Sequence, residues 1–159
     1  MSGAARLDGG DLFKNPVFLS AIISLLTAQF IKMLINIFKY RSRSLKDVLL
    51  TFLWKTGGMP SSHSALVVAL TTSIAFIDGP ASDLFVITVF FSLIVIRDAM
   101  GVRRSAGIQA RTLNILGKDL SNRFGISFRP VKEVQGHSPL QVAVGGLLGF
   151  FIAFAICTL

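Results

Sequence analysis

Long uncharged runs alternate with short polar stretches along this chain of 159 residues. Residues 16–38 contain one charge, Lys32, and residues 139–159 contain none. A helix over 16–38 would be about 34 Å long, enough to cross a hydrocarbon core of about 30 Å. Two further uncharged runs are shorter. The pattern predicts one domain over residues 1–159, an all-α polytopic membrane helical bundle. Its four expected spans are 16–38, about 60–77, about 84–100 and 139–158.

The segments between the spans carry weaker patterns. Residues 45–54 are too short to cross and are expected to lie in the membrane interface. Residues 102–124 mix apolar residues with bases, which predicts a broken amphipathic helix on the cytoplasmic face of the membrane. Residues 125–135 form a connector, because Pro130 excludes a continuous helix. In the last span, the spacing of Gly145 and Gly149 predicts a close contact with another helix.

The distribution of charge indicates how the chain is oriented in the membrane. The hydrophobic fraction is 52%, the charged fraction is 15% and the formal net charge is +8. Residues 32–55 and residues 97–133 each carry a net charge of +5. Basic loops stay in the cytoplasm, so both segments are expected inside and both termini outside. The first apolar run is too long for a cleaved signal peptide and has no basic leader, which favours a bacterial inner membrane. Anionic headgroups account for most of the bases, and a nucleic-acid partner is not expected.

Both histidines of the chain stand just before an apolar run. His63 follows Ser61 and Ser62, either of which can cap a helix. His137 precedes Ser138, the expected cap of the last span, whose first turn would hold a proline. Both helices would begin at the cytoplasmic face, where free amides and the positive dipole end attract anions. Two such sites, each with a histidine, suit phosphoryl chemistry.

Cations are expected at the same face. Arg103 and Arg104 follow the third span and could grip a phosphate. Lys32 and Lys39 lie seven residues apart and hence on one helix face. Lys32 could serve the site or could instead snorkel to the interface. Asp98 is expected to form a salt bridge that orients an arginine or a histidine. No cluster of metal-ligand residues is apparent, so no metal or other cofactor is expected.

These residues resemble the divergent type-2 phosphatidic acid phosphatase family, over nearly the whole chain and in order. Three segments carry the resemblance: Gly57-Gly58-Met59-Pro60-Ser61-Ser62-His63-Ser64-Ala65, Asp98-Ala99-Met100-Gly101-Val102-Arg103, and Gly136-His137-Ser138-Pro139-Leu140. The resemblance implies kinship with lipid phosphatases and vanadium-dependent haloperoxidases. Those proteins use a histidine nucleophile that forms a phosphohistidine, and a second histidine in a Pro-Ser-Gly-His motif as general acid. Lysine and arginine hold the phosphate.

Carried over residue by residue, the resemblance makes His63 the general acid and His137 the nucleophile. Ser62 replaces the glycine of the motif. The superfamily's carboxylate four residues after the nucleophile is here Gln141, and Val131 stands where its arginine is expected. The usual core has six helices, and a homodimer could complete it.

The sequence therefore predicts a metal-independent phosphatase that acts on a lipid phosphate or a polyprenyl diphosphate within membrane lipids. The expected catalytic residues are His137 and His63, supported by Asp98 and Gln141. The expected substrate-binding residues are Lys32, Lys39, Ser61, Ser62, Arg103 and Arg104. The main alternative is a non-catalytic protein that binds or transports lipid phosphates with a degenerate phosphatase site. An assembly subunit packed through the last span is a third.

Overall fold

The computed structural model describes residues 12–39, 58–134 and 136–159, and all regular structure in these ranges is helical. Helix α2 spans Pro16–Lys39 and α4 spans Ser62–Ile77. Helix α5 spans Asp83–Met100 and α6 spans Val102–Phe124. Helix α7 spans Pro139–Thr158. Helices α2, α4, α5 and α7 coincide with the four predicted spans, so the predicted helical membrane bundle is confirmed.

Within the described residues, three stretches are long and apolar enough to cross a membrane: Pro16–Phe38, the continuous Asp83–Phe124, and Pro139–Thr158. Helix α4 is apolar but has only 16 residues, which makes it about 24 Å long. The outer faces of α5 and α7 expose large apolar side chains, among them Ile87, Phe90, Ile94 and Phe151. Such a surface needs a hydrocarbon solvent, and the chain is an integral membrane protein.

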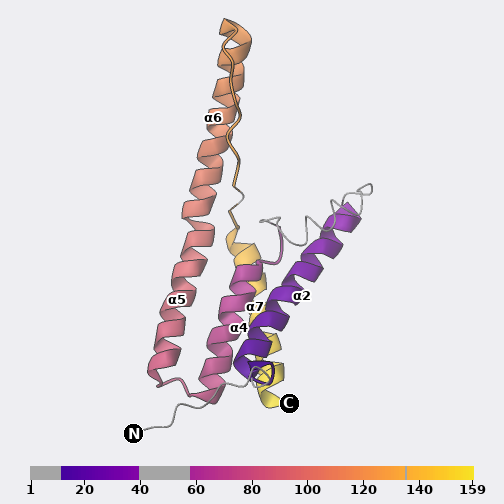
Figure 1. Cartoon of the computed structure of the whole chain (residues 1–159), viewed down its shortest axis with the longest axis vertical. Coiled ribbons are helices and arrows are strands. Elements are labelled where there is room, and N and C mark those ends of the chain that lie inside the picture. The colour runs from indigo at the N-terminus through magenta and orange to yellow at the C-terminus, as the bar shows by residue number, and fades with distance from the viewer. Residues whose placement is uncertain (1–11, 40–57, 135) are drawn as a thin grey trace.

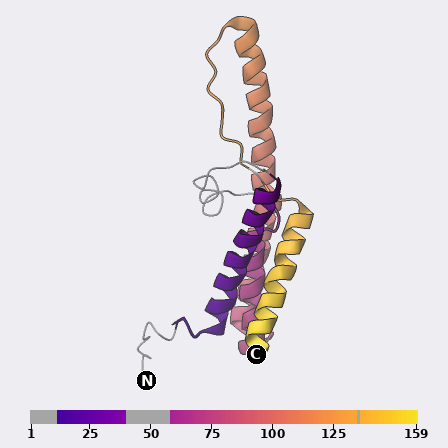
Figure 2. The same cartoon turned by 90° about the vertical axis from the view of Figure 1, so that its right-hand side faces the viewer.

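The four spans run alternately up and down, with α4 between α2, α5 and α7 (Figures 1 and 2). Helices α4 and α7 begin at one end of the bundle, where α2 and α5 end. We call this the upper end, as in Figure 1. The C-terminus lies at the opposite end. The alternation therefore brings the two histidine-bearing helix starts to the same end of the molecule.

Helices α4 and α7 approach closely because α7 presents glycines to the backbone of α4. A Cβ atom at Gly145 would collide with the carbonyl oxygen of Ser61, and one at Gly149 with that of Ala65. Ala65 and Ala153 are fully buried in the bundle. The predicted close contact at these two glycines is confirmed. Small residues are what such an interface requires, since lipid supplies no hydrophobic drive for helix association.

Helices α4 and α5 are joined by hydroxyl groups inside the bundle. The Oγ atoms of Thr71 and Ser92 lie 2.8 Å apart, and Ser92 donates to the carbonyl oxygen of Val67 at 3.1 Å. Thr71 Oγ1 also lies 3.3 Å from the carbonyl oxygen of Thr88. Side-chain bonds of this kind stabilise contacts between helices where water is absent.

Helix α6 differs from the broken helix that the sequence predicts. It is continuous from Val102 to Phe124 and ends at Gly125, whose φ of 68° is left-handed. Helix α6 extends beyond the upper end of the bundle, nearly along the line of α5 (Figures 1 and 2). Its internal glycines lower helix propensity, but packing against the connector compensates for them. The interfacial segment predicted at residues 45–54 lies outside the described residues.

The connector after α6 runs back along that helix over a row of small residues. Asn114 receives the backbone N–H of Val131 at 2.8 Å and donates to its carbonyl oxygen at 2.9 Å. The Phe128 ring occupies the space that a side chain at Gly117 would need. The row consists of Gly107, Ala110, Asn114 and Gly117, at helical spacing. The connector and α6 therefore form one hairpin, which we call the α6 arm.

The glycine contact between α4 and α7 generates a test by single methyl groups. Gly149→Ala places a Cβ against the Ala65 carbonyl group, whereas Gly146→Ala meets only the Val68 Cγ2 atom at 3.5 Å. We expect Gly149→Ala to lower the free energy of unfolding by about 1–3 kcal/mol through overpacking. Gly146→Ala should leave it nearly unchanged. Thermal unfolding of both variants in detergent measures the difference, and equal transition temperatures would contradict this packing.

Candidate functional site at the upper end of the bundle

Two backbone hydrogen bonds join the segments that carry the predicted site. The amide of Ser61 donates to the carbonyl oxygen of Gln141 at 3.0 Å. The amide of His137 donates to the carbonyl oxygen of Ala99, also at 3.0 Å. The first bond ties the start of α4 to the first turn of α7, and the second ties the end of the connector to the end of α5.

Each histidine-bearing helix begins at a capping serine, as the sequence predicts. Ser61 caps α4, and its Oγ accepts the backbone N–H of Ser64 at 3.4 Å. Ser138 caps α7 and accepts the N–H of Gln141 at 3.4 Å, while the Gln141 side chain accepts the Ser138 N–H at 3.0 Å. This reciprocal arrangement is a capping box. It holds the Gln141 side chain beside His137.

The His137 ring is held in one tautomer by Gln141. Its Nδ1 atom lies 3.2 Å from Gln141 Oε1, which also accepts the Ser138 N–H. Because this amide oxygen can only accept, Nδ1 carries the ring proton, and the Nε2 atom is left with a lone pair. The side chain of Gln141 thus lies where the resemblance to the superfamily leads us to expect a carboxylate.

The surroundings of His137 keep its ring neutral. His137 is 5% exposed. Burial is the largest cause that lowers its pKa below the ordinary 6.5, and the hydrogen bond that the ring makes to Gln141 acts in the opposite direction. The positive charges of Lys32 and Arg103 and the nearby His63 lower the pKa further. A neutral imidazole with a free Nε2 lone pair can act as a nucleophile.

Lys32 enters this end of the bundle from α2. Its side chain is 3% exposed, and Nζ donates to Ser62 Oγ at 3.4 Å. The lysine is therefore directed into the bundle and does not snorkel to the interface. A buried ammonium group beside the start of α4 is an anchor for an anion. The side chain of Lys39, at the end of α2, lies outside the described part of the structure.

His63 occupies the first turn of α4 and is exposed. It follows Ser62, which is buried and bonded to Lys32. His63 and Lys32 both lie close enough to His137 for their charges to lower its pKa, and all three residues lie at the upper end of the bundle. The structure thus brings both histidines together from segments that are 74 residues apart in sequence.

Arg103 is positioned by an acidic partner at the junction of α5 and α6. Its Nε atom donates to Asp98 Oδ2 at 2.6 Å, and both side chains are partly exposed. This is the orienting salt bridge that the sequence predicts for Asp98. The partner of His137 Nδ1 is Gln141, so Asp98 serves the arginine in this structure.

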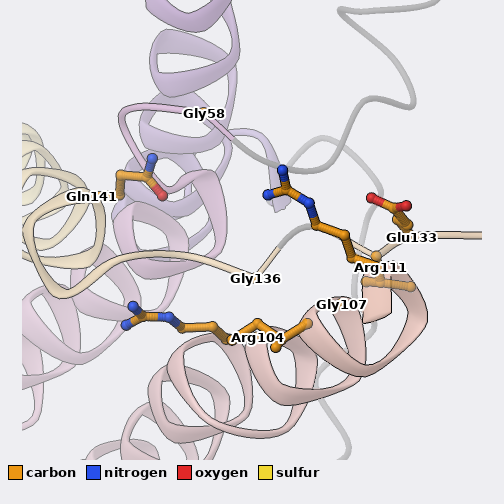
Figure 3. A pocket seen from close by; sticks show the side chains of 9 residues that line it. Gly58, Arg104, Gly107, Arg111, Glu133, Gly136 and Gln141 are labelled. Carbon is orange, nitrogen blue, oxygen red and sulfur yellow. The ribbon is translucent and has the colours of Figure 1, made fainter. Parts of the chain in front are cut away.

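An open pocket of about 320 Å³ begins at Gln141 and continues along α6. Arg104, Arg111 and Glu133 line it, with backbone from Gly58 and Gly136 (Figure 3). The sequence pattern predicts Arg104 as a site residue but does not predict Arg111 or Glu133. Arg111 lies seven residues after Arg104, so the two arginines share one face of the helix, as Lys32 and Lys39 do. This spacing is a signal in the sequence that could have identified Arg111. The position of Glu133 depends on the course of the connector. Its carboxylate accepts a hydrogen bond from Asn114 at 2.9 Å.

Within the described residues, no three or more His, Cys, Asp or Glu side chains gather into a possible metal site. The site instead combines two histidines and one buried lysine, near the N-termini of α4 and α7, with the arginines of α6. Such a set can hold a phosphate group through cations and free amides. It can also transfer protons to and from oxygen atoms of that group.

Comparisons with known proteins identify the family of the chain. A family model described as the Divergent PAP2 family matches residues 13–152. The chain is 39% identical over 158 residues to the "Uncharacterized membrane protein YuiD" of Bacillus subtilis (strain 168), covering 92% of this chain and 96% of that protein. No solved structure matches the chain. On the family match and the extent of this similarity, the chain belongs to the Divergent PAP2 family.

Proposed function

We propose that this membrane protein is a lipid phosphatase that removes phosphate from a phosphate monoester or a diphosphate without a metal ion. The observation that carries the proposal is the state of His137. Its ring is buried and neutral, and its Nδ1 proton is directed to Gln141, which leaves Nε2 available beside His63. A protein that only bound lipid phosphate would need cations and amides and no second histidine.

The reaction proceeds in two steps. In the first, His137 Nε2 attacks phosphorus, and the bond between phosphorus and the lipid oxygen breaks. Protonated His63 gives its proton to that leaving oxygen. In the second step, a water molecule attacks the phosphohistidine, and neutral His63 takes a proton from it. The P–N bond breaks, inorganic phosphate leaves, and both histidines regain their starting states.

The cations of the site hold the phosphoryl oxygens as their charge increases. Lys32 reaches the start of α4 from inside the bundle, and Arg103 is oriented by Asp98. Arg104 lines the adjoining pocket. Free amides after Ser61 and Ser62 add donors at the helix N-terminus. Phosphatidate, phosphatidylglycerophosphate and polyprenyl diphosphate all present the required terminal phosphate at a membrane surface.

A non-catalytic lipid-phosphate binding or transport protein is the second candidate. One observation favours it: the partner of His137 is the neutral amide of Gln141. An amide stabilises the imidazolium that forms during attack less than a carboxylate would. The same cationic site would then hold the lipid without transfer of the phosphoryl group.

The upper end is proposed to face the cytoplasm of a bacterial inner membrane. The α6 arm at this end carries most of the bases of residues 97–133, whose net charge is +5. Basic segments next to membrane spans are retained inside. The relative in Bacillus subtilis is described as a membrane protein.

The first prediction concerns the two histidines. With EDTA present, purified protein should release phosphate from at least one member of a panel of lipid phosphates and diphosphates. His137→Ala should abolish release, and His63→Ala should lower kcat by about 10²–10⁴, the usual contribution of a general acid.

The control for this experiment is Asn122→Ala, an exposed position in the last turns of α6, which should release phosphate at the wild-type rate. Thermal unfolding checks that each variant is folded. Turnover by folded His137→Ala would refute the nucleophile. Wild-type protein that binds lipid phosphates but releases none would favour the second candidate.

The second prediction concerns pH. Because neutral His137 is the attacking form and its pKa is lowered, kcat/KM should persist as pH falls below 6.5, before its acid limb is reached. Gln141→Glu places a carboxylate beside Nδ1, which favours the imidazolium and should move this limb to higher pH. Asn122→Asp makes a similar change of charge far from the site. An acid limb unmoved by Gln141→Glu would contradict the assignment of His137.

The third prediction concerns sidedness. In a Cys157→Ser background, Asn122→Cys marks the α6 arm and Ala81→Cys marks the connection between α4 and α5, at the opposite end of the bundle. An impermeant maleimide applied to intact cells should label Ala81→Cys and leave Asn122→Cys unlabelled. The reverse labelling would place the site outside the cytoplasm.

A further inference from the structure

Helix α6 carries an exposed stripe with the spacing of a coiled coil. Its members are separated alternately by four and three residues, and all are exposed. They are Val102, Ala106, Gln109, Leu113, Leu116 and Leu120. Leu113, Leu116 and Leu120 are 53%, 54% and 41% exposed. Alternate spacing of three and four keeps residues on one seam of a helix that winds around another.

In the observed arrangement, helix α6 and its stripe lie beyond the ends of the four spans. Helix α6 rises beyond the upper end of the bundle instead of turning at Gly101 to lie across it (Figures 1 and 2). Helix α6 also contains six charged residues, too many for a membrane span. Three leucines on one face of a helix outside the bundle need another protein surface.

The other two faces of α6 are already assigned. The connector covers the face that contains Gly107, Asn114 and Gly117. Arg104, Arg111 and Lys118 recur every seven residues, half a helical turn away from the stripe. The stripe is therefore free of the connector and separated from this row of positive charge. Two exposed isoleucines, Ile108 and Ile115, lie outside it.

We infer that the stripe pairs with α6 of a second copy of this chain in a parallel coiled coil. All copies cross the membrane in the same orientation, so their α6 helices point the same way. A two-fold axis along the membrane normal would set each stripe residue against its own counterpart. The positions that flank the seam are Arg103, Ser105, Ala110, Thr112, Gly117 and Asp119, and the seam ends at Arg123, the next position of the same spacing. In a parallel pair, Ser105 opposes Ala110 of the second copy and Thr112 opposes its Gly117, so the flanks do not oppose like charges. Paired Gln109 amides can bond across the axis.

This dimer does not depend on the proposed phosphatase activity, and it leaves the site open. The pocket that begins at Gln141 is lined by Arg104 and Arg111, which belong to the face opposite the stripe. Pairing through the stripe would direct both pockets away from the dimer axis. A substrate could therefore reach each copy independently.

Cysteine crosslinking in membranes tests the inference. In a Cys157→Ser background, Leu116→Cys lies on the stripe, and Lys118→Cys lies two residues away on the opposite face. On oxidation with copper phenanthroline, Leu116→Cys should shift to twice the monomer mass, and Lys118→Cys should remain monomeric. Equal crosslinking of the two variants, or no crosslinking of either, would overturn the proposed contact between the two α6 helices.

A second measurement covers the outcome in which lipid lies on the stripe. A spin label at Leu116 should show the low oxygen accessibility of a protein contact, whereas one at Ile94 on α5 should show the high accessibility of lipid. Equal, lipid-like values would overturn the dimer.

Leu116→Lys with Leu120→Lys should also halve the protein mass measured by light scattering in detergent, with the thermal unfolding of the bundle unchanged. Wild-type protein of monomer mass, or a double variant that keeps the dimer mass, would overturn the inference.

Discussion

The structure depends on the close approach of α4 and α7 at the upper end of the bundle. Gly145 and Gly149 allow the α7 backbone to reach the carbonyl groups of Ser61 and Ala65. At that distance the Ser61 amide can donate to the carbonyl oxygen of Gln141. The two helix starts, with their capping serines and histidines, are thereby held together. A larger side chain at either glycine would separate the two halves of the candidate site, so the packing of α7 on α4 sets the geometry of that site.

The second constraint comes from the α6 arm, which determines where His137 lies. The connector is fixed to α6 by the side chain of Asn114 and by Phe128 packed on Gly117. It then delivers His137 to the carbonyl oxygen of Ala99. An extended segment of this kind has no internal hydrogen bonds of its own, so its course is set by the helix beneath it. The arm thus positions the histidine from outside the bundle, while the α4–α7 contact positions it from within.

Electrostatics then decide the state of the site. Lys32 is buried next to Ser62, and Arg103 is held by Asp98, so two cations act on His137, which is itself buried. Burial and these charges keep His137 neutral, and Gln141 selects its tautomer. The departure of this chain from a carboxylate at that position therefore preserves the geometry while reducing the stabilisation of positive charge.

The sequence by itself determined the four spans, the capping serines, the close contact at the two glycines and the salt bridge of Asp98. These follow from local patterns: charge-free length, cap chemistry, helical spacing and neighbouring opposite charges. The continuity of α6, the direction of Lys32 and the pocket residues Arg111 and Glu133 were decided only by the tertiary structure. Each depends on a surface that another segment provides. The connector compensates for the glycines of α6, Ser62 receives Lys32, and Asn114 holds Glu133. Hydropathy and spacing describe one segment at a time and contain no information on such pairings.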